Sequence, residues 1–170
     1  MELDKSTFKK STFRAKFGAV FEHSAWVADA VYDSGKDLVS SDTETLCRHF
    51  ESVFMASAPE LQLETLRAHP QLVGALADPA DLTSDSAREQ SGAGLDRCSR
   101  DEMKAFDDLN TAYVAKFGFP FIIAVKGRNR QAILDEFRRR LQNDDVTEYQ
   151  TALRQVCQIA RFRIEGMSDV

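Results

Sequence analysis

Apolar residues recur at spacings of three and four along most of this chain, which is typical of helices that bury one face. Helices are predicted at about 12–23, 24–35, 42–57, 59–69, 86–94, 99–117, 129–142 and 147–165. The fold class predicted is therefore all-α, a bundle of about eight helices. A chain of 170 residues is expected to form a single domain over 1–170.

Polar residues in front of these segments predict where the helices begin. The predicted N-caps are Thr12, either Ser41 or Asp42, and Ser99, with Glu102 completing a capping box. Ser24 is expected to start the second helix. Pro59 suits the first turn of a helix, and Gly35 a helix end.

The segment 117–125, with the sequence FGFPFIIAV, interrupts the helical pattern. Its aromatic and β-branched residues favour extended chain, and Pro120 prevents the preceding helix from continuing. One short extended segment is thus expected near 119–125. Its backbone groups need hydrogen-bond partners, and either an amide-rich substrate or a neighbouring loop would supply them.

The stretch from His69 to Asp96 is the other interruption. The His-Pro step ends a helix at His69, because proline disfavours the α conformation in the residue before it. Ser86 and Glu89 have the spacing of an N-cap and its capping-box partner. Alternatively, His69, Glu89 and Gln90 converge on one pocket that faces the positive end of the following helical turn.

The phase of the last helix separates two arginines. Arg163 continues the buried positions 149, 153, 156 and 160, whereas Arg161 falls on the polar face. A buried guanidinium needs an acceptor, which either Glu89 or a ligand would provide. The run 138–140, Arg-Arg-Arg, is interpreted as a solvated face. Asn110 lies beside a buried stripe, where it either braces a neighbouring loop or faces solvent.

Composition excludes several classes of protein. A net charge of −5 and a pI near 5.2 argue against nucleic-acid and anionic-membrane surfaces, and no apolar run approaches the length of a membrane span. The N-terminus lacks the apolar core of a secretory signal. Cys47, Cys98 and Cys157 show no paired spacing, so a reduced, cytoplasmic protein with inert thiols is expected.

Metal-dependent hydrolysis is disfavoured, because the three histidines have no HxxxH or HxH spacing and the cysteines form no CxxC. No metal site is therefore predicted. His23, at a helix junction, is interpreted as a structural residue.

Four blocks carry a family resemblance: HPQL, LTSDSAREQSGAGLD, LNTAYVAKFGFPFII and IARFRI, in this order. Together they resemble the 2-oxo-4-hydroxy-4-carboxy-5-ureidoimidazoline (OHCU) decarboxylases of urate degradation, from about Phe17 to Ile164. The chain departs from the family at Gln71, where HPDL is common, and at Ala25, where proline is common.

The resemblance implies an all-α, homodimeric enzyme that acts on a small ureidoimidazoline without metal or organic cofactor. It implies loss of CO₂ from OHCU and protonation on one face, giving (S)-allantoin. Catalysis is carried onto His69, with Glu89 beside it. The implied substrate contacts are Pro70, Ser86, Ala87, Arg88, Glu89, Gln90, the backbone of Phe121, Ile122, Ile123, Ala124 and Val125, and Arg163.

The residues alone leave another interpretation open. In a helical binding or interaction module without chemistry, His69 would be an ordinary helix-end residue and Arg163 part of an internal salt bridge.

Overall fold

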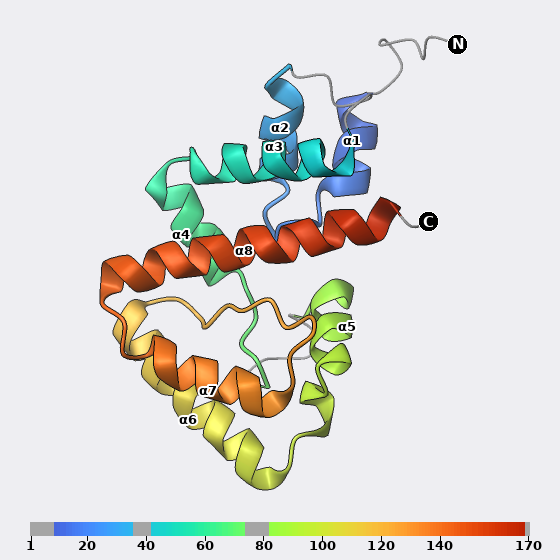
Figure 1. Cartoon of the computed structure of the whole chain (residues 1–170). Coiled ribbons are helices and arrows are strands. Elements are labelled where there is room, and N and C mark those ends of the chain that lie inside the picture. The colour runs from blue at the N-terminus through green and yellow to red at the C-terminus, as the bar shows by residue number, and fades with distance from the viewer. Residues whose placement is uncertain (1–8, 36–41, 74–81, 169–170) are drawn as a thin grey trace. The chain divides into compact units, whose positions relative to one another are not determined.

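The structure, a computed structural model, describes residues 9–35, 42–73 and 82–168. In these ranges it contains eight α-helices, one 3-10 helix and no strand (Figure 1), which confirms the predicted all-α fold. The helices are α1 (Lys10–Phe17), α2 (Trp26–Asp33), α3 (Thr43–Met55), α4 (Pro59–Arg67), α5 (Ser84–Gly92), the 3-10 helix η2 (Leu95–Arg97), α6 (Arg100–Phe117), α7 (Arg130–Arg140) and α8 (Asp145–Ser168).

The chain forms two compact units. Unit 1 comprises residues 1–65 and 157–170, and unit 2 comprises residues 66–156. The 24 residues of α8 therefore contribute to both units. No helix in the described ranges is long and apolar enough to cross a membrane.

Unit 1 is built on an aromatic core. Helix α1 packs on α2, and α2 packs on α3. The rings of Phe13 and Phe50 stack at a centroid distance of 6.0 Å, and those of Phe21 and Phe54 lie 4.9 Å apart. Each of these side chains is almost fully buried, so each ring stabilises the unit by about 1.5–3 kcal/mol.

Unit 2 has its own aromatic core, formed where α6 packs on α7. Tyr113 of α6 meets Phe137 of α7 edge-on, and Phe121 stacks on Phe137 at 3.8 Å between centroids. Met103, in the first turn of α6, falls at helical spacing from the buried Phe106 but is 47% exposed.

Two predicted helix starts are confirmed. The Thr45 amide donates to the Asp42 side chain at 2.7 Å in front of α3, whereas Ser41 lies outside the described residues. In front of α6, the Glu102 amide donates to the Ser99 hydroxyl at 3.2 Å, and the Ser99 amide donates to the Glu102 carboxylate at 2.7 Å. That second bond is the main reason why the pKa of Glu102 lies below its usual value.

Two other predicted helix starts are wrong. Thr12 lies inside α1, which begins at Lys10 without a side-chain cap. Ser24 precedes α2 by two residues, and its hydroxyl forms a buried hydrogen bond with that of Thr65 at 3.0 Å. The Ser24 hydroxyl thus takes part in a contact that is distant in sequence. Gly35 follows α2 with φ +67°, as expected for a helix end.

These helix starts predict unequal effects of two similar substitutions. Ser99→Ala should lower the free energy of unfolding by about 1 kcal/mol, because the capping box loses its hydroxyl acceptor. Thr12→Ala should change it by less than about 0.5 kcal/mol, since an exposed residue inside a helix loses no cap. Urea denaturation of both variants measures the difference, and a larger effect at Thr12 would contradict the observed start of α1.

Candidate functional site

His69 lies just beyond the end of α4. The helix stops at Arg67, and the His69 amide still donates to the Leu66 carbonyl at 3.3 Å. Pro70 follows directly, so the predicted His-Pro helix stop is confirmed. The imidazole is not an exposed helix-end group, because His69 is only 8% exposed.

The backbone that follows His69 is held by two side-chain amides. The Val73 amide donates to Gln90 Oε1 at 3.3 Å, and Gln90 Nε2 donates to the Gln71 carbonyl at 3.5 Å. Asn110 of α6 donates from Nδ2 to the Leu72 carbonyl at 2.8 Å. Asn110 therefore braces the neighbouring loop, one of the two roles considered for it. Gln90 of α5 therefore holds the backbone after His69, in addition to its predicted contact with the substrate.

Val73 adopts a left-handed conformation with φ +53°. A β-branched residue in this region is an outlier that costs about 1–3 kcal/mol. The hydrogen bonds that Gln90 and Asn110 make to residues 71–73 stabilise this backbone and so offset part of that cost. Beyond Val73, residues 74–81 of the predicted interruption lie outside the described residues.

Helix α5 begins earlier than the sequence predicts. Its N-cap is Thr83, whose hydroxyl accepts from the Ser86 amide at 3.3 Å, so Ser86 is not the cap. Ser86 is instead buried within the first turn of the helix. Glu89 and Gln90 are half-buried, whereas Ala87 and Arg88 are exposed.

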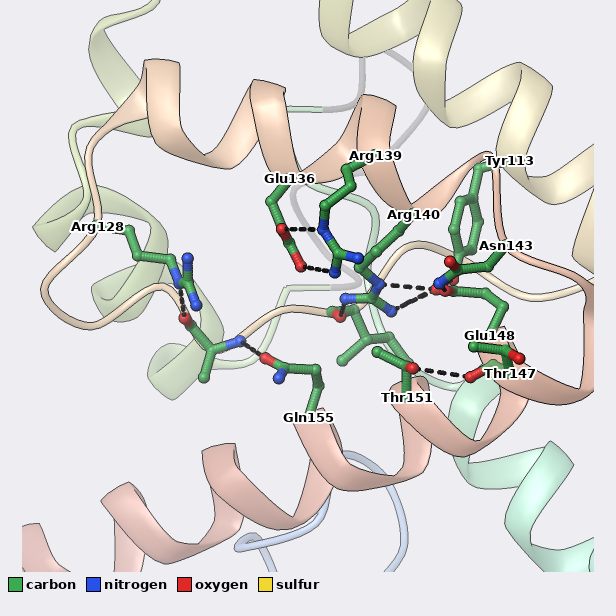
Figure 2. Close-up of polar contacts among 12 residues, drawn as sticks. Tyr113, Arg128, Glu136, Arg139, Arg140, Asn143, Thr147, Glu148, Thr151 and Gln155 are labelled. Atoms are coloured by element: carbon green, nitrogen blue, oxygen red, sulfur yellow. Dashed lines mark hydrogen bonds and ion pairs between the residues drawn. The ribbon is translucent and has the colours of Figure 1, made fainter.

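Residues 119–125 form the expected extended segment (Figure 1), and all of them are buried. Side chains hold one edge of its backbone. Arg140 Nη1 donates to the Ile122 carbonyl at 2.6 Å, and Gln155 Oε1 accepts from the Ala124 amide at 2.9 Å. Arg128 Nε donates to the Ala124 carbonyl at 3.3 Å (Figure 2). The partners on this edge are side chains of α7 and α8 and that of Arg128, which lies in the loop directly after the segment.

The opposite edge of the segment is different. In extended chain the N–H and C=O groups of successive residues point to opposite sides, so those of Phe121, Ile123 and Val125 face away from residues 122 and 124. Within the described ranges, the amides of these three residues donate no hydrogen bond, and neither do the carbonyls of Phe121 and Ile123 accept one. A ligand that carries both N–H and C=O groups complements this edge.

Arg140 corrects the interpretation of residues 138–140 as a solvated face. Arg138 and Arg139 are exposed and pair with Asp135 and Glu136, but Arg140 is 0% exposed. Its phase gave the signal, because Arg140 continues the buried positions 133 and 137 at helical spacing.

Arg163 is buried in unit 1, which confirms its inward phase. Its Nη1 donates to Glu22 Oε2 at 2.9 Å and lies 3.4 Å from the carbonyl oxygens of Ala19 and Val20. Arg161 is partly exposed and pairs with the exposed Glu44. The expected acceptor for Arg163 was Glu89 or a ligand, so Glu22 was missed. It lies in the non-helical connection between α1 and α2, where helical phase gives no information.

The remaining candidate residues, the cysteines and His23, are inert or do not lie together in a site. All three cysteines are free, and burial raises the pKa of the Cys157 thiol to about 12. His23 is exposed, with φ +48°. Among the described residues, no group of three or more His, Cys, Asp or Glu side chains is placed to hold a metal ion.

Comparison with known proteins identifies a family. A family model described as OHCU decarboxylase matches residues 6–165. The chain is 37% identical over 153 residues to a 2-oxo-4-hydroxy-4-carboxy-5-ureidoimidazoline decarboxylase of Haloferax volcanii, covering 90% of this chain and 87% of that protein. It is 35% identical over 161 residues to the uric acid degradation bifunctional protein PucL of Bacillus subtilis, covering 95% of this chain but only 31% of that protein.

Two solved structures are also similar to this chain. The crystal structure of (S)-allantoin synthase superposes with a TM-score of 0.74 at 28% identity, covering 93% of this chain and 50% of that one. The crystal structure of OHCU decarboxylase in the presence of (S)-allantoin has a TM-score of 0.71 over 89% of this chain and 96% of that one. At 23% identity, this second similarity concerns the fold alone.

The two arginine pairs of α8 predict unequal effects of the same chemical change. Glu22→Gln should lower the free energy of unfolding by about 3 kcal/mol, because it leaves the Arg163 charge buried without its carboxylate. Glu44→Gln should have little effect, since exposed ion pairs contribute little to stability. Thermal unfolding of both variants measures this, and equal stability losses would show that burial does not distinguish the pairs.

Proposed function

The chain belongs to the OHCU decarboxylase family, and from this membership we propose how its residues carry out the family's reaction. That reaction is the decarboxylation of OHCU to (S)-allantoin in urate catabolism, which makes the chain a carboxy-lyase. One observation supports the residue roles best. Two of the family's four blocks, HPQL and LNTAYVAKFGFPFII, contain the two irregular features of unit 2, His69 with its braced loop and most of the extended backbone at 121–125.

The reaction requires a group that takes up the electron pair left behind when CO₂ departs. When the bond between the ring carbon and the carboxylate breaks, CO₂ leaves and its bonding electrons stay on the ring carbon. The adjacent C=N group of OHCU can delocalise this pair, so no cofactor is required as an electron sink. The C=N nitrogen that takes up the pair is protonated. A proton is then added on one face of the adjacent ring carbon, which bears the ureido group, while the 4-hydroxyl group loses its proton and becomes a carbonyl, and this gives (S)-allantoin.

His69 is the proposed acid/base group. Histidine titrates near neutral pH, and the site needs a group that exchanges a proton there. Glu89, half-buried on α5, is proposed either to fix the tautomer of His69 or to accept from the ureido N–H groups. The bonds from Gln90 and Asn110 to residues 71–73 hold the backbone next to His69 and so limit its movement.

The free backbone edge at Phe121, Ile123 and Val125 is proposed to bind the ureido group and ring amides of the substrate. These substrate groups offer both donors and acceptors, as the edge does. Further contacts are proposed for Pro70 and for residues 86–90.

Arg163 is proposed to bind a position where negative charge grows. A tight bond to the departing carboxylate would stabilise the ground state and oppose its loss, whereas a bond to an oxygen or ring position that gains charge lowers the barrier. The Arg163–Glu22 pair is also the internal salt bridge that a module without chemistry would contain. Membership of the decarboxylase family favours the enzyme.

We also propose that the enzyme is a cytoplasmic homodimer. The family resemblance supports the dimer. The three free cysteines are compatible with a reducing compartment.

The direct test of the function is a stereochemical assay. OHCU is generated enzymatically from urate, and the appearance of (S)-allantoin is followed by circular dichroism with and without the protein. The protein should accelerate formation of the single enantiomer. Racemic allantoin formed at the spontaneous rate would contradict the function.

His69→Asn should lower kcat by about 10²–10⁴-fold, the usual contribution of a general acid/base group. His23→Asn is the matched control, because His23 is exposed and asparagine tolerates its positive φ. The control should keep the wild-type rate. If His69→Asn retained more than about half of that rate, His69 would lose its role.

Removal of metals should not affect turnover, because the substrate itself delocalises the electron pair. Protein dialysed against a chelator should keep the kcat of untreated protein in the same assay. Activity that disappeared on dialysis and returned with one divalent ion would favour metal-dependent chemistry.

A further inference from the structure

A buried polar cluster in unit 2 joins α6, α7 and α8. Arg140 donates from Nε to Glu148 Oε1 at 2.8 Å and from Nη2 to the same oxygen at 2.5 Å. The Tyr113 hydroxyl also donates to Glu148 Oε1, and Asn143 Nδ2 donates to Glu148 Oε2 at 2.8 Å (Figure 2). Arg140, Glu148 and Tyr113 are each 0% exposed.

A buried ion pair of this kind is weak evidence for a role in stability. Two charges lose their hydration on burial, and apolar residues of similar volume often give an equally stable protein. Apolar residues could not, however, supply the third hydrogen bond of Arg140. Its Nη1 leaves the cluster and donates to the Ile122 carbonyl at 2.6 Å.

Arg140 contacts the extended segment in a second way. Its guanidinium carbon lies 4.5 Å from the centroid of the Phe121 ring, within the range of a cation–π contact. The same side chain thus fixes one backbone carbonyl and the neighbouring ring. Glu148 holds the guanidinium through two of its nitrogen atoms, so the direction of the third is set as well.

We propose that Arg140 is a positioning residue for decarboxylation, acting through the Ile122 carbonyl on the substrate-binding edge at Phe121, Ile123 and Val125. Gln155 has the same role two residues further along the segment, because it accepts from the Ala124 amide. Because the two edges of extended chain point in opposite directions, a bond that orients residues 122 and 124 also orients the groups of residues 121, 123 and 125. This inference rests on the proposed binding role of that edge.

Tyr113 completes the cluster without touching the bond to Ile122. Burial, followed by its bond to Glu148, raises the pKa of the Tyr113 phenol well above its ordinary value. The phenol therefore remains a donor at working pH. Tyr113 and Asn143 support Glu148, whereas Arg140 and Gln155 hold the segment.

The test compares two pairs of variants. Arg140→Lys keeps the charge beside Glu148, but its single nitrogen cannot also supply the bond that Nη1 donates to the Ile122 carbonyl. Gln155→Met removes the acceptor of the Ala124 amide. Tyr113→Phe and Asn143→Ala are the controls, because they weaken the same cluster and leave both bonds to the segment intact. For each variant, Tm, kcat and KM are measured with OHCU.

The segment variants should lose about tenfold or more in kcat/KM, as expected when a charged or buried hydrogen bond is lost. Most of this loss should appear in KM, because the edge binds groups that do not react. The controls should keep kcat/KM within about threefold of wild type even where their Tm falls. Controls as damaging as the segment variants, or segment variants that match wild type, would overturn the proposal.

If Arg140→Lys does not fold, the double variant Arg140→Met with Glu148→Gln decides, since it removes both buried charges together. A folded double variant with raised KM supports positioning, and one with wild-type kinetics overturns it. Failure of the catalytic assignment is detected separately. His69→Asn with wild-type turnover would remove the role of His69, while the comparison of these variants would still decide the role of Arg140.

Discussion

The structure of unit 2 depends on one requirement: the backbone polar groups of a buried extended segment need partners. Helices satisfy this requirement internally, but in the part of the chain that the structure describes residues 119–125 have neither a helical ladder nor a neighbouring strand. Arg140, Gln155 and Arg128 provide the bonds on one edge. The other edge keeps donors and acceptors available, which is the property that a site for an amide-rich substrate needs. A segment that looks costly for folding is thereby suited to binding.

The two buried arginines follow a common design, one in each unit. Each pairs with a buried carboxylate, and each also donates to backbone carbonyls outside the helices. Arg140 pairs with Glu148 and reaches Ile122, whereas Arg163 pairs with Glu22 and approaches the carbonyls of Ala19 and Val20. Planar guanidinium groups suit this task because they present several donors in fixed directions. The ion pairs are therefore best understood as devices that set the geometry of irregular backbone.

Helical periodicity predicted most of the helices and the inward phase of Arg163, and Pro70 predicted the helix stop at His69, because each of these depends on residues close in sequence. The same reasoning would have found Arg140, had the run of three arginines not suggested a solvated face. Other features depend on contacts that are distant in sequence. The Ser24 hydroxyl bonds to Thr65, and Glu22 meets Arg163 across 141 positions. No local pattern carries that information. The family resemblance supplied the reaction, which the residues alone left open between an enzyme and a binding module.

One edge of the 121–125 backbone is proposed to serve the fold and the other to serve the ligand. Residue-resolved amide hydrogen exchange, measured by NMR with and without (S)-allantoin, tests it most directly. The Ala124 amide, bonded to Gln155, should exchange slowly in both samples, whereas the amides of Ile123 and Val125 should become markedly slower only when (S)-allantoin is bound. Exchange at Ile123 and Val125 that (S)-allantoin leaves unchanged at saturating concentration would contradict the claim.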